Sequence, residues 1–262
     1  MNKKLPLDYY LKHIIGLIIH VFMLLLFGKT ALYIDELDLT DAPLTTIKTH
    51  RYVYFTWWNF IAQIIFMFVA MFDVFALILN APTIVQKFLQ CLRTILYNGI
   101  VLPFGLVLSS FFWLLYFINR DTVYPASYEY IFPSWVNNTF HIYMVIPIYL
   151  ELWLPKREFF IKGNFAITVL LPVLFSYFYV SLKANVKTGV WMYTFFYNQA
   201  VWMIKFKAIL LVFIFTSIVA KIGAYIQMFK KPKLSRSQKK RLQKQKQLGN
   251  TNLKNLLSLA FE

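Results

Sequence analysis

Residues 52–79 read YVYFTWWNFIAQIIFMFVAMFDVFALIL, with Asp73 as their only charged residue. A helix needs roughly 20 mainly apolar residues to cross the hydrocarbon core of a bilayer, and this run exceeds that length. It therefore predicts a membrane-spanning helix.

The composition of the whole chain indicates the same class of protein. Apolar residues make up 59% of the 262 residues and charged residues 15%, whereas a typical soluble domain is about 45–50% apolar and about 25% charged. The high hydrophobicity excludes a disordered chain. Cys91 is the one cysteine, which excludes an internal disulfide framework. We therefore expect an all-α, multi-pass membrane protein.

Five further stretches have the length and hydrophobicity of a span. Together with the first, they give six expected transmembrane helices, at residues 7–27, 52–79, 95–118, 135–154, 165–182 and 202–228. The first could pass for a signal peptide, but no small-x-small cleavage site follows it, so it is interpreted as a retained helix. We expect one six-helix transmembrane domain over residues 1–229.

The remaining residues, 230–262, form a strongly basic tail. Residues 229–262 carry ten Lys or Arg against one acidic residue, which is +9 of the net charge of +16. Because cytosolic segments of membrane proteins are enriched in Lys and Arg, both termini are predicted to be cytosolic. We expect the tail to bind anionic lipid and not nucleic acid, since it follows a membrane helix and its basic run has no interleaved aromatic residues. The expected location is the endoplasmic reticulum or the plasma membrane.

Two polar side chains, Thr56 and His141, are predicted to lie at similar depth in one leaflet. Thr56 follows Arg51 by five residues, about 7 Å of helix. His141 follows Trp135 by six residues, about 9 Å. Polar groups at membrane depth face the bundle interior or water, so a hydroxyl and an imidazole there could form a nucleophile and its base. The structural alternative is a Thr bonded to its own helix and a His that bridges helices.

Two asparagines lie on the same helix faces as this pair. Asn59 follows Thr56 by three residues. Asn137 precedes His141 by four. Either amide could orient the pair or donate to an oxyanion, and either could equally cross-link helices.

The carboxylates within the predicted spans lie too far along the helix axis to join this pair. Asp73 is 17 residues, about 25 Å, from Thr56. Glu151 is ten residues, about 15 Å, from His141. Asp73 and Glu151 are expected to share the opposite leaflet, either as groups that bond helix to helix or as part of a proton or ion path.

A carboxylate that orients His141 would have to come from a connector, where Asp121 and Glu129 lie on the correct side of the membrane. No metal site is expected, because the four His and one Cys form no cluster with metal-ligand spacing. We expect no other cofactor either.

Three segments resemble the androgen-induced gene product family. The family patterns F-W-x-x-Y, D-R-E, Y-P and P-x-W-x-N, with a His four residues on, are similar to FWLLY at 112–116, NRD at 119–121, YP at 124–125 and PSWVN at 133–137 with His141. RYVYFTWWN at 51–59 resembles R-W-K-Y-L-T-F-x-N, and TGVWMY at 188–193 resembles T-G-M-W-V-Y-P. The resemblance covers roughly residues 50–195.

Members of that family are described as intramembrane threonine hydrolases of fatty acid esters of hydroxy fatty acids. The resemblance implies that Thr56 is the nucleophile and His141 the base, the same two residues that helix depth pairs. The chain departs from the family where relatives have histidine, at Asn138 and at 185–186, and where they have proline, at Thr194. These departures bear on substrate preference and leave the nucleophile and base in place.

We therefore expect a lipid-ester hydrolase that takes its substrate from the bilayer. Two alternatives stay open at this point. A transporter or channel would use a polar path through His20, Asp73, Glu151 and Lys221, although the chain has no inverted repeat. A non-catalytic membrane adaptor would act through its basic tail.

Overall fold

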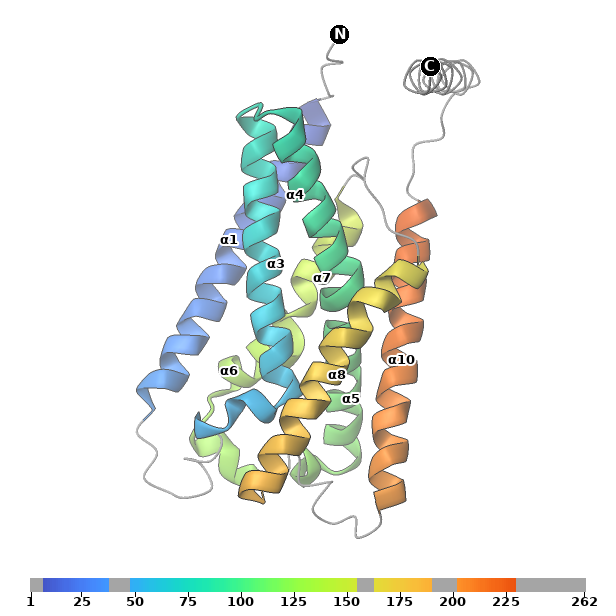
Figure 1. Ribbon diagram of the computed structural model, residues 1–262. Coiled ribbons are helices and arrows are strands. Elements are labelled where there is room, and N and C mark those ends of the chain that lie inside the picture. Colours follow the sequence, from blue (N-terminus) through green and yellow to red (C-terminus); the bar gives the residue numbers. More distant parts are fainter. Residues whose placement is uncertain (1–6, 38–47, 155–162, 190–201, 230–262) are drawn as a thin grey trace, which may run out of the picture. The chain divides into compact units, whose positions relative to one another are not determined.

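The computed structural model of the chain describes residues 7–37, 48–154, 163–189 and 202–229. These residues form helices and turns and contain no β-strand (Figure 1). Five of the helices are long and apolar enough to cross a membrane. This confirms the prediction of an all-α, multi-pass membrane protein. The basic tail lies outside the described residues, so its lipid binding and the cytosolic location of both termini stay predictions.

The α-helices, which carry most of the described residues, are α1 Leu7–Glu36, α3 Phe55–Ile78, α4 Thr83–Leu96, α5 Leu102–Ile118, α6 Ser134–Asn138, α7 Val145–Trp153, α8 Gly163–Thr188 and α10 Trp202–Phe229. Short 3₁₀ segments are η1 Arg51–Val53, η3 Arg120–Thr122 and η4 Ala126–Tyr130. Two π-helical turns are η2 Tyr97–Val101 and η5 Thr139–Tyr143.

Helix α1 is longer than the sequence predicts. A connector was expected from residue 28 on, but the helix continues to Glu36. Gly28 disfavours a helix by only about 1 kcal/mol relative to Ala. Phe27, Thr30 and Ile34 are buried at helical spacing on both sides of it, so one buried face continues through Gly28. The end of α1 is linked to η1, because Asp35 forms an ion pair with Arg51 at 2.5 Å.

The predicted connector at 80–94 is also wrong, because most of it is helix α4. Asn80 adopts a φ of 50°, a left-handed conformation that Asn tolerates, and this residue turns the chain after α3. The chain then stays helical from Thr83 to Ile118, over 36 residues. Helices α3 and α4 pack against each other as a hairpin (Figure 1).

The fourth predicted span, 135–154, is not one continuous helix. It consists of α6, the π-turn η5 and α7. Proline has no N–H to donate to the preceding turn of a helix, and its ring crowds that turn. A wider π-helical turn before the proline relieves this crowding. Both π-turns of the described chain precede a proline in this way, η2 before Pro103 and η5 before Pro147. The other five predicted spans coincide with helices of spanning length, and the sixth crossing stays a prediction.

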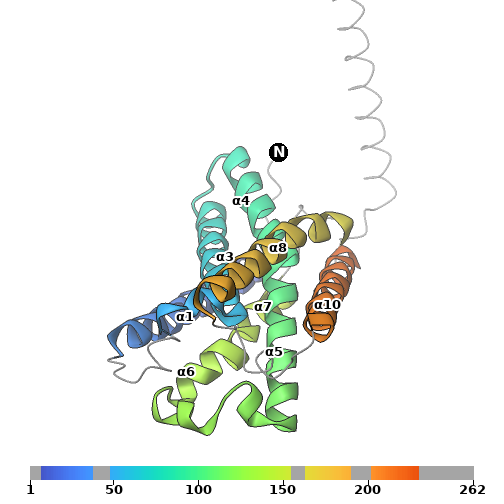
Figure 2. The same cartoon turned by 60° about the horizontal axis from the view of Figure 1, so that its bottom comes forward.

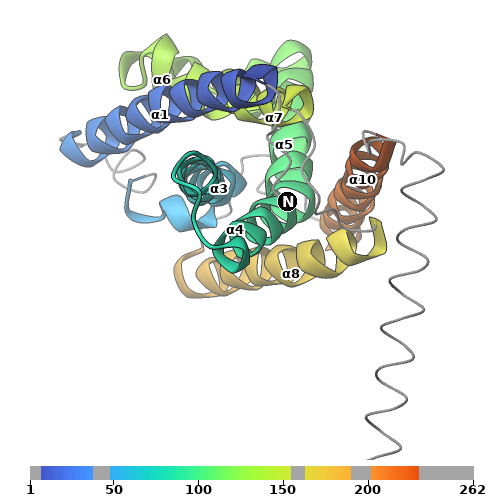
Figure 3. The ribbon, with the colours of Figure 1, turned by 90° about the horizontal axis from the view of Figure 1, so that it is seen from above.

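The core is built around α3. Seen from above, α3 lies among α1, α4, α5 and α8 (Figure 3). Helix α10 packs on α5 and α8 at the outside. Aromatic rings join these elements, such as Phe27 stacked on Phe60 with ring centroids 4.7 Å apart, and Phe55 against Phe104 at 4.6 Å.

Gly99 sits where η2 meets α8, and its lack of a side chain permits that approach. A Cβ at this position would lie 2.9 Å from Cβ of Val169, a β-branched residue whose Cβ cannot rotate away. We expect Gly99→Ala to lower the free energy of unfolding by about 1–3 kcal/mol. Gly28→Ala is the matched control, since a Cβ there meets nothing within 4 Å, and it should stabilise by about 0.5–1 kcal/mol. Unfolding in mixed micelles measures both, and equal effects would contradict the assignment.

Candidate active site around His141

His141 lies in the π-turn η5, where the backbone of the fourth predicted span is irregular. Its carbonyl oxygen accepts hydrogen bonds from two side chains of α5, Ser109 Oγ at 2.8 Å and Trp113 Nε1 at 3.3 Å. Further along, Gln63 Nε2 donates to the carbonyl of Met144 at 3.2 Å. Side-chain donors from neighbouring helices thus hold the irregular backbone in place.

The imidazole of His141 is oriented by Asn137. Nδ1 lies 3.0 Å from the backbone oxygen and 2.9 Å from the side-chain oxygen of Asn137. Both are acceptors, so Nδ1 must carry the hydrogen. The neutral ring then has its lone pair on Nε2, which is the atom available to act as a base.

One face of this ring is covered by Phe112 of α5. The two rings are stacked, with centroids 3.5 Å apart and planes 9° from parallel. Both side chains are buried. Phe112 therefore fixes the plane of the imidazole, while Asn137 fixes its rotation within that plane.

Thr56 is the second residue of α3 and is half-buried. The 3₁₀ segment η1 precedes it, and the Arg51 guanidinium lies over the Trp57 ring, 4.7 Å from its centroid. The first N–H groups of a helix have no acceptor within the helix, and they carry its partial positive charge. The Thr56 hydroxyl is thus at a helix end that favours negative charge.

The first turns of α3 lie against the π-turn that carries His141. Asn59 donates from Nδ2 to Met144 Sδ at 2.8 Å, and Phe60 packs on Phe140 with centroids 5.0 Å apart. Thr56 is one helical turn before this pair of contacts. The structure therefore places Thr56 and His141 on two segments that pack together, and their roles as nucleophile and base stay a prediction.

The two asparagines of the predicted site differ in what they contact. Asn137 bonds the ring of His141, as the orienting alternative requires. Asn59 donates a hydrogen bond from its amide nitrogen to the sulfur of Met144, which is a weak acceptor. Its side-chain oxygen is buried and has no hydrogen-bond partner in the described part of the chain. Asn59 could give up the sulfur to donate to an oxyanion, so both of its predicted roles stay open.

The connector between α5 and α6 (Figure 2) reaches this site, because the Tyr124 ring lies against Phe112 with ring centroids 6.5 Å apart. Glu129 forms an ion pair with Arg120 at 2.6 Å, and Asp121 accepts no bond from His141, whose Nδ1 is held by Asn137. Tyr124 donates to the carbonyl of Phe132 at 2.9 Å. Burial raises the pKa of Tyr124, the charge of Glu129 raises it further, and Arg120 opposes both. Tyr124 thus stays a protonated donor at physiological pH.

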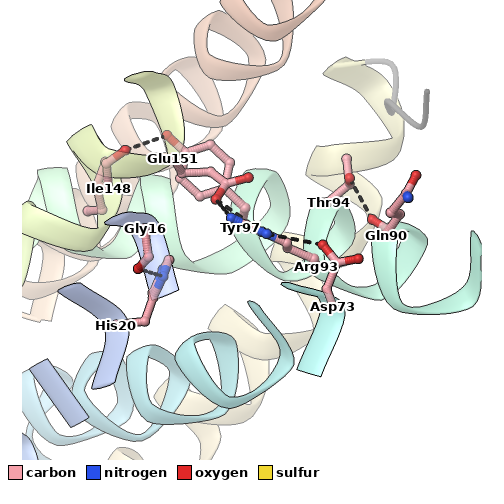
Figure 4. Close-up of polar contacts among 9 residues, drawn as sticks. All are labelled: Gly16, His20, Asp73, Gln90, Arg93, Thr94, Tyr97, Ile148 and Glu151. Atoms are coloured by element: carbon pink, nitrogen blue, oxygen red, sulfur yellow. Dashed lines mark hydrogen bonds and ion pairs between the residues drawn. The ribbon is translucent and has the colours of Figure 1, made fainter. Parts of the chain in front are cut away.

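A second polar cluster, drawn in Figure 4, is buried in the bundle and shares no residue with the contacts of His141. Arg93 of α4 contacts Asp73 of α3 at 3.0 Å and Glu151 of α7 at 2.5 Å. The sequence predicted a shared leaflet for Asp73 and Glu151 but assigned Arg93 to a connector. The helical spacing of TIVQKFLQCLRTIL at 83–96 was the signal for a buried face there. Lys221, expected on the same path, is exposed on α10.

Among the described residues, no three His, Cys, Asp or Glu side chains come close enough to hold a metal ion. Residues 190–194, which include the end of the third family-like segment and Thr194, lie outside the described residues.

The chain matches a family described as FAR-17a/AIG1-like protein over residues 15–227. It is 29% identical to the androgen-dependent TFPI-regulating protein of Mesocricetus auratus over 147 residues, 56% of this chain and 62% of that protein. For the human protein of the same name, identity is 27% over 110 residues, 42% of this chain and 47% of that protein.

Human androgen-induced gene 1 protein is 23% identical over 109 residues, 42% of this chain and 45% of that protein. The chain thus spans less than two thirds of the length of each of these relatives. Their names describe regulation or induction, and none names a reaction. No solved structure is significantly similar to this chain.

Proposed function

This chain belongs to the FAR-17a/AIG1-like family, and from that membership and the surroundings of His141 we propose that it is an intramembrane lipid-ester hydrolase. Thr56 is the proposed nucleophile and His141 the proposed general base. The proposed substrate is an ester of a fatty acid with a hydroxy fatty acid, which enters from the bilayer.

The observation that carries the proposal is the hydrogen bonding of His141. Its Nδ1–H is held by two oxygens of Asn137, which leaves the Nε2 lone pair to accept a proton. A third group that orients the base is the arrangement by which a hydroxyl nucleophile is activated. Here the orienting group is a neutral amide, so the site needs no carboxylate.

In the first half of the proposed reaction, the Thr56 oxygen attacks the ester carbonyl while His141 Nε2 takes the hydroxyl proton. The intermediate then collapses, and the leaving alcohol takes that proton from His141. An acyl ester of Thr56 remains.

In the second half, His141 removes a proton from water as the water attacks the acyl ester. The fatty acid leaves, and the proton returns to the Thr56 oxygen. The negative charge that develops on the carbonyl oxygen in each half would be stabilised by the first N–H groups of α3 and, where it releases Met144, by Asn59.

The test uses the full chain in nanodiscs with a fluorophosphonate probe, which forms a stable adduct with an activated hydroxyl. We expect mass spectrometry to find the adduct on Thr56, and we expect His141→Ala to lose it. Release of both products from a fatty acid ester of a hydroxy fatty acid would establish the substrate class. Folded protein without an adduct, or with one elsewhere, would overturn the proposal.

Asn137→Ala removes the side-chain acceptor from Nδ1 of His141. We expect kcat for ester hydrolysis to fall roughly 10–100-fold, because the ring keeps only the backbone oxygen of residue 137 as acceptor and its rotation is less firmly fixed. Asn98→Ala is the control, since that amide donates to the carbonyl of Thr94 in its own helix at 3.0 Å. Unchanged kcat in Asn137→Ala would remove the orienting role.

A further inference from the structure

Two side-chain amides of α3, Asn59 and Gln63, lie one helical turn apart on one face of the helix, and both are buried. Their nitrogens contact the same residue. Asn59 Nδ2 donates to Sδ of Met144 at 2.8 Å, and Gln63 Nε2 donates to the Met144 carbonyl at 3.2 Å. Because a carbonyl can only accept, the nitrogen of Gln63 must face Met144 and its oxygen must point elsewhere.

The oxygens of the same two amides lack donors. Asn59 Oδ1 and Gln63 Oε1 are buried, and neither has a hydrogen-bond partner among the described residues. A buried acceptor without a donor is costly, and buried polar groups are nearly always paired. The hydrocarbon of a bilayer offers no donor either. Two such acceptors on adjacent turns indicate a binding site for a small molecule that donates hydrogen bonds.

This amide pair belongs to the same junction of α3, α5 and η5 as His141. Gly105 of α5 faces the pair, since a Cβ there would lie 3.2 Å from Gln63 Nε2 and 3.7 Å from Asn59 Oδ1. Position 105 thus brings bare backbone close to the amides and offers them no side-chain donor. Ser109, one turn further along α5, donates to the carbonyl of His141 instead.

Water is the molecule that fits these two acceptors. It is small and uncharged, and its two O–H groups match two oxygens. An alcohol has only one O–H to donate, and an ammonium ion would bring an uncompensated charge into the bundle. Buried waters typically bond polar groups that are otherwise unpaired, as these two are.

We propose that Asn59 and Gln63 bind a water molecule inside the membrane-spanning bundle, and that this site provides the water that hydrolyses the Thr56 acyl ester. The second part rests on the proposed function. Asn59 follows Thr56 by three residues on one face of α3, and Met144 follows His141 by three residues. The bound water is therefore held between the segments that carry the nucleophile and the base.

In the second half of the proposed reaction, this water releases one amide and donates to Nε2 of His141. His141 takes that proton as the water oxygen bonds to the acyl carbon. The Thr56 oxygen then leaves and regains the proton from His141. Asn59 and Gln63 act through the water, so in this step they are positioning residues.

The binding of water is tested first, on the full chain in nanodiscs and without substrate. Solid-state NMR spectra of protein labelled with ¹⁵N at Asn and Gln are edited for magnetisation that comes from water. Gln63→Met and Asn59→Leu, which keep side-chain size, identify the two signals. We expect both side-chain amides to receive magnetisation from water although they are buried.

The same variants test whether one water is shared by the two amides. Asn59→Leu removes one of the two acceptors, so transfer from water to Gln63 should fall at least about threefold. Gln90→Met is the matched control, because Gln90 is a half-buried glutamine of α4. It should leave the transfer to Gln63 unchanged.

Gln63→Met then tests the supply of water to the reaction. Loss of the bound water should slow hydrolysis of the acyl ester and leave its formation within about twofold. With a fatty acid ester of a hydroxy fatty acid, we expect kcat to fall at least about tenfold and the acylated fraction of the protein to rise. Mass spectrometry of the intact protein measures this fraction, and Gln90→Met should change neither value.

The possible failures are distinguishable. Folded protein in which neither amide receives magnetisation from water would overturn the binding site, whatever the reaction. Equal slowing of both halves of the reaction in Gln63→Met would overturn the supply of water. A chain in which Thr56 is neither acylated nor labelled by the fluorophosphonate would overturn the proposed function and the supply together, while the NMR result would still decide whether water is bound.

Discussion

Thr56→Ala is expected to lower ester hydrolysis by at least about 10⁴-fold and to abolish labelling by the fluorophosphonate probe. The substitution removes the only atom that forms the covalent bond in the proposed reaction, and loss of a nucleophile costs this much or more in hydroxyl-based hydrolases. The hydroxyl lies at the start of α3, so its removal leaves the packing of Phe55 and Phe60 in place. Product release and adduct formation are both measured on folded protein.

Two variants make this result interpretable. Thr56→Ser keeps the hydroxyl and should retain activity to within about 10²-fold. Thr30→Ala removes the hydroxyl of a Thr that bonds the Leu26 carbonyl of its own helix at 2.9 Å, and it should be fully active. Hydrolysis by Thr56→Ala at the rate of the unaltered protein would eliminate Thr56 as the nucleophile.

Arg93→Gln is expected to lower the free energy of unfolding by about 3–5 kcal/mol. The substitution leaves Asp73 and Glu151 close together in the bundle without their shared cation, and a buried ion pair that loses one partner costs about this amount. Unfolding in mixed micelles gives the value. Lys87→Gln is the control, because Lys87 is exposed on the same helix, and it should change stability by less than about 0.5 kcal/mol.

The charge argument can be separated from lost packing by one further protein. Combining Arg93→Gln with Asp73→Asn and Glu151→Gln removes all three charges while side-chain size stays similar. Because the triple variant leaves no unpaired charge in the bundle and its three amides can hydrogen-bond one another, we expect it to regain most of the lost stability. A triple variant as unstable as Arg93→Gln alone would show that packing, and not charge, explains the loss.

The spans follow from the sequence because length and hydropathy alone define them. The rise per residue also predicted that Asp73 and Glu151 share a depth, and they share Arg93. Arg93 itself was missed because a charged residue near a turn suggests a connector. Its burial depends on carboxylates from two other helices, which no local pattern contains.

For the candidate site, helical spacing predicted that Asn137 and His141 share a face, and their hydrogen bond confirms it. Spacing left open whether Asn137 orients the ring or donates to an oxyanion, and the hydrogen bond between its side-chain oxygen and His141 Nδ1 now favours the first. The stacking of Phe112 on His141 was not predictable, because the π-turn changes where the imidazole points and α5 approaches from a distant part of the chain.

The π-turn η5 sets the directions in which His141 and Glu151 point from the segment made of α6, η5 and α7. A residue advances an α-helix by about 100°, so one inserted residue rotates everything after it by about that angle relative to what precedes it. His141 faces Phe112 of α5, while Glu151 of α7 reaches Arg93 of α4. Deleting a single residue between 139 and 143 would restore a regular helix and turn one of these groups toward lipid. The spacing between the two centres is thus set by an insertion, and a shorter chain of otherwise identical sequence could not satisfy both.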